Sequence, residues 1–388
     1  MNNKTVSFIK DTVFTLTSVI PIAVSISVCS GMGVFAGAVF ACIAALILPA
    51  VEPKKQTPVY ISLLIITYTF SAFGASTVSL GVIICGLLLI IASCFTGKIK
   101  KKININNPAV SSALMLSGAL TVTILFTTDY FGIGASGNTV KEIIASYLSL
   151  GFHPNWRGVL YGTIVMVVMI TFPRKFKKGC KTIDAAFSAL IITTGLNLLL
   201  NPSDMISAIH ETGILSPDEY LNNIILPLRN SAPSYLNAIL SGLALFISSF
   251  NMIIQTDDYK KSDLIISGAA NCITGLCTCM PIPCGLRKDK YTVGLVSSVL
   301  TAAFFFVFND LIARIPVHSC AVMLIVGAWQ SVKWGEIKKV FINLPFSPII
   351  FVAVIALSLL FGIVNGIIIS AIISIIYHIT EGKTVKGS

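Results

Sequence analysis

The chain has 388 residues, and only 11% of them are Asp, Glu, Lys or Arg. A soluble domain carries about 25% charged residues, whereas here hydrophobic residues make up 55% and the mean hydropathy is +0.88. The composition excludes a soluble multidomain protein and predicts a protein embedded in lipid.

The predicted elements follow from runs that contain no charged residue. A transmembrane helix needs about 20 mostly apolar residues, so the runs 12–51 and 56–97 each hold two crossings. Gly74 divides the second run into elements near 58–73 and 77–95. Single crossings are predicted in the runs 103–128, 158–173, 185–203, 230–256, 291–309 and 315–332, and two more in the run 340–380.

The run 264–286 holds one helix, which Pro281 and Pro283 are expected to end before a partial crossing begins. The total is then about fourteen membrane elements, and we predict an all-α polytopic membrane protein. The segment Val140–Leu150 is predicted to be an interfacial helix. The first hydrophobic run is too long for a cleavable signal, so we expect it to stay as a membrane anchor.

Lysine and arginine residues are divided unevenly between the two faces of this map. Twenty of the 27 fall on the side of the N-terminus and four on the other side, while Arg287, Lys288 and Lys290 fall inside an element. Because cytoplasmic loops are enriched in positive residues, we expect a multi-pass protein of the plasma membrane with both termini in the cytoplasm. The net charge of +11 then reflects topology and not nucleic-acid binding.

An odd number of elements in each half predicts an inverted repeat. The segment 199–232, an expected extracellular connecting loop, separates a first repeat, residues 1–198, from a second repeat with a short cytoplasmic tail, residues 233–388. A repeat with seven crossings enters its second copy from the opposite face, as in many secondary transporters. Pro58 and Pro281 interrupt the third element of each half, so short half-helices are predicted at elements 3 and 10.

The two interruptions predict an anion-binding site. Half-helices that start after Pro58 and Pro281 would point two N-termini at a shared cavity, each with free N–H groups and a partial positive charge. Arg287 and Lys288 follow in the second half-helix. A cation inside a membrane element is costly, which makes it a candidate functional residue. An ordinary cytoplasmic loop over residues 287–290 is the alternative.

Other chemistry is not indicated by the sequence. Cys277, Cys279 and Cys284 cluster near the second interruption, but their spacing matches no standard zinc pattern. The four histidines are scattered, and no catalytic triad, carboxylate pair or phosphate loop is present. We therefore expect no metal, no cofactor and no enzyme activity.

Several segments together resemble the sulfate permease (SulP) family of anion transporters, and the resemblance covers nearly the whole chain. They are Ile20-Pro21-Ile22-Ala23, Thr57-Pro58-Val59, Asn155-Trp156 with Phe172-Pro173-Arg174, Ser262-Asp263-Leu264-Ile265 with Gly268-Ala269-Ala270-Asn271, the segment from Pro281 to Lys288, and Ile315-Pro316-Val317 with Ala328-Trp329. The resemblance implies core and gate domains built from two intertwined repeats, with substrate held between the third and tenth elements. It also implies elevator-like alternating access, usually in a homodimer.

The chain departs from the family pattern at positions that matter for transport. Ile22 replaces the polar Gln of the first helix, and Ser248 stands where the family has an acidic residue tied to ion coupling. The pair Arg287-Lys288 replaces Ser-Arg, and Lys offers a point charge where Arg has a planar fork. The chain ends about eight residues after its last span, so we expect the family's cytoplasmic STAS domain to be absent.

The sequence favours a secondary transporter of a small inorganic or carboxylate anion, such as sulfate, bicarbonate or chloride. The alternatives are a nucleobase permease of the same fold and an uncoupled anion channel; a membrane scaffold without transport is a further one. The expected partners are the anion, the lipid bilayer and a second copy of the chain. The candidate substrate-binding residues are Arg287, Lys288, Gly285, Cys284, Leu286, Thr57, Val59, Tyr60, Ile22 and Ser248.

Overall fold

A computed structural model describes most of the chain, and every regular element in the described part is a helix. This confirms the predicted all-α class, and helices are the structure that satisfies backbone polar groups in lipid. The described residues are 3–29, 34–47, 59–102, 108–134, 140–175, 185–200, 234–254, 261–277, 281, 291–312, 314–343 and 347–384.

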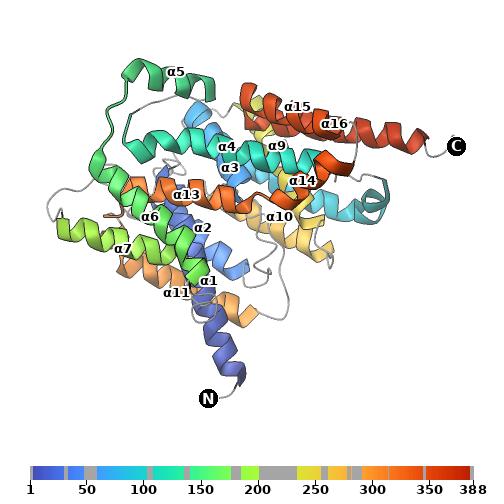
Figure 1. The fold of residues 1–388 in the computed structure, drawn as a ribbon. Helices are drawn as coiled ribbons and strands as arrows, with labels where there is room; N and C mark the ends of the chain where they lie inside the picture. The colour runs from blue at the N-terminus through green and yellow to red at the C-terminus, as the bar shows by residue number, and fades with distance from the viewer. Residues whose placement is uncertain are drawn as a thin grey trace.

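The helices agree closely with the expected crossings (Figure 1). In the first half they are α1 (Asn3–Cys29), α2 (Val34–Ile47), α3 (Val59–Lys102), α4 (Pro108–Phe131), α5 (Val140–Leu150), α6 (Trp156–Lys175) and α7 (Ala185–Leu200). In the second half they are α9 (Tyr235–Ile254), α10 (Lys261–Leu276), α11 (Tyr291–Val307), α12 (Asn309–Ile312), α13 (Val317–Ser331), α14 (Trp334–Asn343), α15 (Ser347–Leu360) and α16 (Ile363–Thr384).

Three helical segments of the described part are long and apolar enough to cross a bilayer by themselves. They are Thr5–Cys29, Ser76–Phe95 and Ala109–Phe131. The remaining apolar helices have 10 to 17 residues in the described part. Short helices of this kind are tolerated at membrane depth where neighbouring protein covers their ends.

Gly74 divides α3 into the two elements that the sequence predicts. Its backbone has φ 79° and ψ 176° inside an otherwise helical segment, a conformation that is essentially restricted to glycine. Residues 59–73 are therefore the third element and residues 75–102 the fourth. The helix predicted over Val140–Leu150 is also present, as α5. The amphipathic helix α14, by contrast, was not expected.

The helices form two groups, and each group takes helices from both halves of the chain. In the first group α3 packs extensively against α9 and α10, while α11 packs against α1 and α2. In the second group α13 packs against α4 and α6, α15 packs against α4 and α16, and α6 packs against α7. This intertwining matches the core and gate domains that the family resemblance implied, and we use these two names below.

Several helix contacts repeat when each helix is replaced by its counterpart seven membrane elements away. In this count α3 supplies two elements, and α5, α12 and α14 are left out. The contact of α6 with α13 corresponds to that of α15 with α4, and the contact of α2 with α11 corresponds to that of α10 with α3. The pair α6 and α7 likewise corresponds to α15 and α16. Such paired contacts are what two structurally related halves produce, so the packing agrees with two inverted repeats.

A sequence match at the start of α4 and α13 supports the same correspondence. Residues 108–116 read PAVSSALML and residues 316–324 read PVHSCAVML, with Pro, Ser, Ala, Met and Leu at the same five positions. In this alignment Met115 of the first repeat corresponds to Met323 of the second repeat. The expected boundary between the repeats falls mostly on residues 201–233, which lie outside the described residues.

Glycines hold the core helices at short distances. A Cβ added to Gly86 of α3 would lie 2.6 Å from the carbonyl oxygen of Gly268 in α10, and one added to Gly268 would lie 2.7 Å from that of Gly86. Close to this crossing, the Ser79 hydroxyl donates a hydrogen bond to the carbonyl oxygen of Gly275 over 2.6 Å. Small residues let transmembrane backbones approach closely and gain van der Waals contact.

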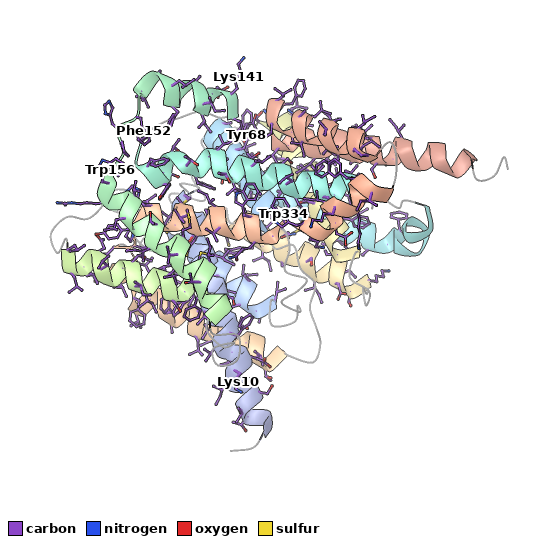
Figure 2. The ribbon with its side chains drawn as sticks, viewed as in Figure 1. Lys10, Tyr68, Lys141, Phe152, Trp156 and Trp334 are labelled. Carbon is purple, nitrogen blue, oxygen red and sulfur yellow. The ribbon has the colours of Figure 1, made fainter. Side chains whose placement is uncertain are left out.

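Exposed aromatic residues mark one end of the bundle. Figure 2 shows Phe152 and Trp156 near α5, far from Lys10 close to the N-terminus. Their exposed fractions are 53% and 69%. Tryptophan and other aromatic residues favour the boundary between lipid and water, so this end is expected to lie at a membrane surface.

Candidate functional site

The third element places polar groups directly after the first interruption. Helix α3 begins at Val59, and its first turn carries Ser62, which is only 1% exposed. The hydroxyl oxygens of Ser62 and of Thr67 are buried without a hydrogen-bond partner in the described part of the chain. A buried hydroxyl without a partner costs free energy, so Ser62 offers an unused hydrogen bond where the helix N-terminus favours an anion.

Most residues of the predicted anion site lie outside the described residues. These are Thr57, Cys284, Gly285, Leu286, Arg287 and Lys288. Val59 and Tyr60 are described as the first two residues of α3, without their side chains. In the second interruption Pro281 is described and is buried, five residues after the end of α10.

The other two predicted site residues lie in the core domain. Ile22 follows Pro21 inside α1 and packs against the hydrophobic core as a half-buried side chain. Ser248 lies in α9, where its hydroxyl donates a hydrogen bond to the carbonyl oxygen of Leu245 over 3.0 Å. Its hydroxyl is therefore occupied within its own helix in this conformation.

A second polar region lies where α1 of the core domain meets α4 and α13 of the gate domain. The Ser25 hydroxyl donates a hydrogen bond to the Met323 sulfur, with 3.9 Å between Oγ and Sδ. Asp129 lies in the last turn of α4, and Cys320 of α13 is fully buried. Helices α1 and α13 thus contribute polar groups to one contact between the two domains.

His318 fixes the gate side of this contact. Its Nδ1 atom lies 2.6 Å from the backbone carbonyl oxygen of Asp129, so the imidazole ties the start of α13 to the end of α4. The ring is 5% exposed and packs against the backbones of Gly132 and Gly158, where an added Cβ would overlap it. The glycines leave the space that this ring occupies.

Asp129 was missed because the charge-free run ends at Thr128. That run predicted a crossing that stops before the acid. The helix in fact continues to Phe131, and the crossing segment Ala109–Phe131 contains Asp129. The sequence does contain a signal that could have found Asp129: it is a carboxylate in the last turn of a helix that carries no other charged residue.

The described residues contain no group of three or more His, Cys, Asp or Glu side chains that could hold a metal ion. The described cysteines form no disulfide bond with one another; they are Cys29, Cys42, Cys85, Cys94, Cys272, Cys277 and Cys320. Cys279 and Cys284 of the cysteine cluster near the second interruption lie outside the described residues.

Solved structures of other proteins share this fold, and three of them are compared with the chain in turn. The transmembrane domain of a cyanobacterial bicarbonate transporter, BicA, matches 93% of this chain and 96% of its own chain, with a TM-score of 0.67 and 16% sequence identity. The overall structure of SLC26A9 matches 95% of this chain and 64% of its own, with a TM-score of 0.63 and 13% identity. The murine anion transporter Slc26a9 in the inward-facing state matches 96% of this chain and 68% of its own, with a TM-score of 0.68 and 11% identity.

The chain therefore spans about two thirds of the length of the two SLC26A9 structures and nearly all of the BicA membrane domain. No protein-family model and no curated protein matches its sequence. At these identities the comparisons establish the fold. This is a multi-pass membrane protein with the membrane-domain fold that the resemblance to the sulfate permease family implied, and that expectation is confirmed.

Proposed function

We propose that the protein is a secondary transporter that moves a small inorganic or carboxylate anion by alternating access. The observation that carries this proposal is the shared fold, since two of the three similar structures are described as a bicarbonate transporter and an anion transporter. The separation of the helices into core and gate domains supports movement of one domain against the other.

The anion is proposed to bind between the start of the third element and the segment that follows Pro281. The N-terminus of α3 provides free N–H groups and a partial positive charge, and the Ser62 hydroxyl adds a donor that has no partner among the described residues. Arg287 and Lys288 supply the positive charge from the second half of the chain. Gly285 and Cys284, both small, allow the backbone to approach the anion closely.

Three further features complete the proposal. The termini lie in the cytoplasm, because most of the lysine and arginine residues fall on their side of the membrane. The repeats comprise residues 1–198 and 233–388. The working unit is a homodimer in the plasma membrane, as the family resemblance implies.

The test is anion uptake into proteoliposomes by the purified chain and by the double variant Arg287→Gln/Lys288→Gln. We expect the wild type to take up at least one of sulfate, bicarbonate or chloride, and the variant to lose at least 90% of that flux. Lys338→Gln/Lys339→Gln is the matched control, because these lysines lie on α14 and Lys339 pairs with Glu336 at the surface. It removes the same charge and is expected to keep normal flux.

The outcomes separate the proposal from its alternatives. Unchanged flux in the Arg287/Lys288 variant would overturn the site assignment. Uptake of uracil or xanthine in place of anions would identify a nucleobase permease, and voltage-driven anion current without countertransport would identify a channel. No flux of any solute would overturn transport itself.

A further inference from the structure

Helix α14 lies at the end of the bundle opposite α5 (Figure 1). His318, at the start of α13, contacts the backbone of Asp129 in the last turn of α4, and α5 is the next helix after α4. Helix α14 begins at Trp334, just after the other end of α13 at Ser331. This is the end at which most lysine and arginine residues of the chain fall, which is the cytoplasmic face in the orientation proposed above.

One face of α14 holds the helix against the gate domain. Ile337 and Val340 are buried and belong to the hydrophobic core, and α14 contacts α4 and α15. The ring of Trp334 stacks on Trp329 of α13, with 5.9 Å between the ring centroids. Burial and stacking together fix the position of α14, so its remaining faces point away from the gate domain.

A second face of α14 combines bulky apolar side chains with a lysine. Trp334, Lys338, Phe341 and Ile342 recur at the spacing of helical turns, so they lie along one side of the helix, which we call the outer stripe. Its three apolar side chains are between 52% and 78% exposed, and Lys338 is exposed as well. Exposed apolar residues along a short amphipathic helix are typical of a helix that lies in the membrane interface.

The charges of α14 are balanced everywhere except on the outer stripe. Glu336 and Lys339 form an ion pair with 3.1 Å between Oε1 and Nζ, and their positions in the helix turn them away from the stripe. Lys338 forms no ion pair with another described residue. Two adjacent lysines therefore differ: the charge of Lys339 has a partner within the helix, and the charge of Lys338 is left for a ligand.

The composition of the outer stripe fits an anionic lipid. A lysine among apolar side chains extends its ammonium group to the level of the lipid phosphates while its neighbours contact the acyl chains. Anionic lipids of the cytoplasmic leaflet attract lysines that lie close to the membrane surface. Free inorganic phosphate would match the charge of Lys338, but it has no apolar part to contact Trp334, Phe341 or Ile342.

We propose that the outer stripe of α14 is a binding site for an anionic phospholipid of the cytoplasmic leaflet. Lys338 contacts the phosphate of the headgroup, and Trp334, Phe341 and Ile342 contact the start of the acyl chains. The bound lipid attaches the gate domain to this leaflet. This interaction is separate from the anion site proposed above and does not depend on it.

The experiment uses the purified full chain in a non-ionic detergent, to which phosphatidylglycerol, phosphatidylcholine or sodium phosphate is added. The readouts are the unfolding temperature over each titration and the number of lipid molecules bound in native mass spectrometry. The variants are Lys338→Gln and Lys338→Arg. Lys339→Gln is the matched control, because it removes the same charge from the adjacent residue and leaves the outer stripe intact.

We expect phosphatidylglycerol to raise the unfolding temperature of the wild type at concentrations at which phosphatidylcholine and sodium phosphate do not. Lys338→Gln should weaken this binding about fivefold, the effect of one lysine near an anionic membrane surface. Lys338→Arg and Lys339→Gln should both bind phosphatidylglycerol within about twofold of the wild type, because each keeps a cation on the outer stripe.

Three results would overturn the proposal. Equal binding of phosphatidylglycerol by the wild type and Lys338→Gln, or equal weakening by Lys338→Gln and Lys339→Gln, would place the lipid elsewhere. Equal responses to phosphatidylglycerol and phosphatidylcholine would exclude recognition of charge. A response to sodium phosphate alone would identify a site for a free anion. None of these readouts involves transport, and in vesicles of phosphatidylcholine Lys338→Gln/Lys339→Gln is still expected to keep normal anion flux.

Discussion

The hydroxyl of Ser25 in α1 donates a hydrogen bond to the thioether sulfur of Met323 in α13, and these residues are 298 positions apart in the chain. Alignment of the interrupting prolines Pro58 and Pro281 makes Ser248 the counterpart of Ser25. The match between residues 108–116 and 316–324 makes Met115 the counterpart of Met323. The contact of Ser25 with Met323 therefore has a defined partner contact, Ser248 with Met115, that α9 and α4 do not make in this conformation.

The first prediction is that these two contacts form in alternation. In a background without native cysteines, the pair Ser25→Cys/Met323→Cys should be joined by a short thiol cross-linker, and the link should abolish anion flux. The pair Ser248→Cys/Met115→Cys should cross-link only while the transporter is turning over. Both links are expected to stop flux, because each holds the core domain against the gate domain on one face.

The control for these links is Tyr130→Cys/Thr163→Cys. The two hydroxyls lie 3.0 Å apart on α4 and α6, both in the gate domain, so this link should form under all conditions and leave flux intact. Simultaneous cross-linking of both test pairs in one molecule, without distortion of the fold, would contradict alternating closure.

The second prediction concerns the glycine contact inside the core domain. Gly86→Ala should destabilise the protein, because the new Cβ would lie 2.6 Å from a backbone oxygen of α10 that cannot move aside alone. Overpacking of this kind typically costs about 1–3 kcal/mol. The measurement is the unfolding temperature in detergent.

Gly195→Ala provides the comparison for that substitution. Gly195 lies within α7, and an added Cβ would meet nothing within 4 Å. Alanine favours a helix over glycine by up to about 1 kcal/mol, so this variant should keep or raise the unfolding temperature. Equal effects of the two substitutions would show that the contact between Gly86 and Gly268 is not close.

The third prediction tests the fit of His318 between α4 and α6. Gly158→Ala should destabilise the gate domain, since its Cβ would overlap the imidazole ring. In the His318→Ala background the same substitution should cost much less, because the ring is gone. A double-mutant cycle on the free energy of unfolding should give a coupling of about 0.5–3 kcal/mol. Additive effects would contradict the packing of the ring against Gly158.

The sequence predicted the helices well because a run without charges reports directly how favourably a segment enters lipid. It also predicted the break at Gly74, since glycine tolerates a conformation that other residues avoid. It did not predict which helices touch, because hydropathy carries no information on lateral packing in a uniformly apolar protein. It missed α14 because Lys338 and Lys339 interrupt the apolar run. This helix is amphipathic, with one polar face and one apolar face.

The candidate site was predictable only in part. The two interruptions were predicted from their prolines. Arg287 and Lys288 were selected for their charge inside a membrane element, and the site that they form stays a prediction. Asp129 was not singled out because the predicted crossing ended at Thr128, although a carboxylate in the last turn does not stop a helix. Ser62 drew no attention because its significance lies in a missing hydrogen bond, which no sequence pattern reports.

The fourth prediction uses Ser62 to test the anion site. Ser62→Ala should leave stability without ligand unchanged or higher by up to about 1 kcal/mol, because it removes a buried hydroxyl that has no partner in the described part of the chain. The same variant should bind the anion more weakly, so that a given anion concentration raises its unfolding temperature less than that of the wild type. The control is Ser358→Ala on α15, where another buried hydroxyl lacks a partner among the described residues. It should alter stability in the same direction and keep the full anion-induced rise. If Ser62→Ala keeps the full rise as well, the N-terminus of the third element does not contact the anion, and the site must lie elsewhere in the core domain.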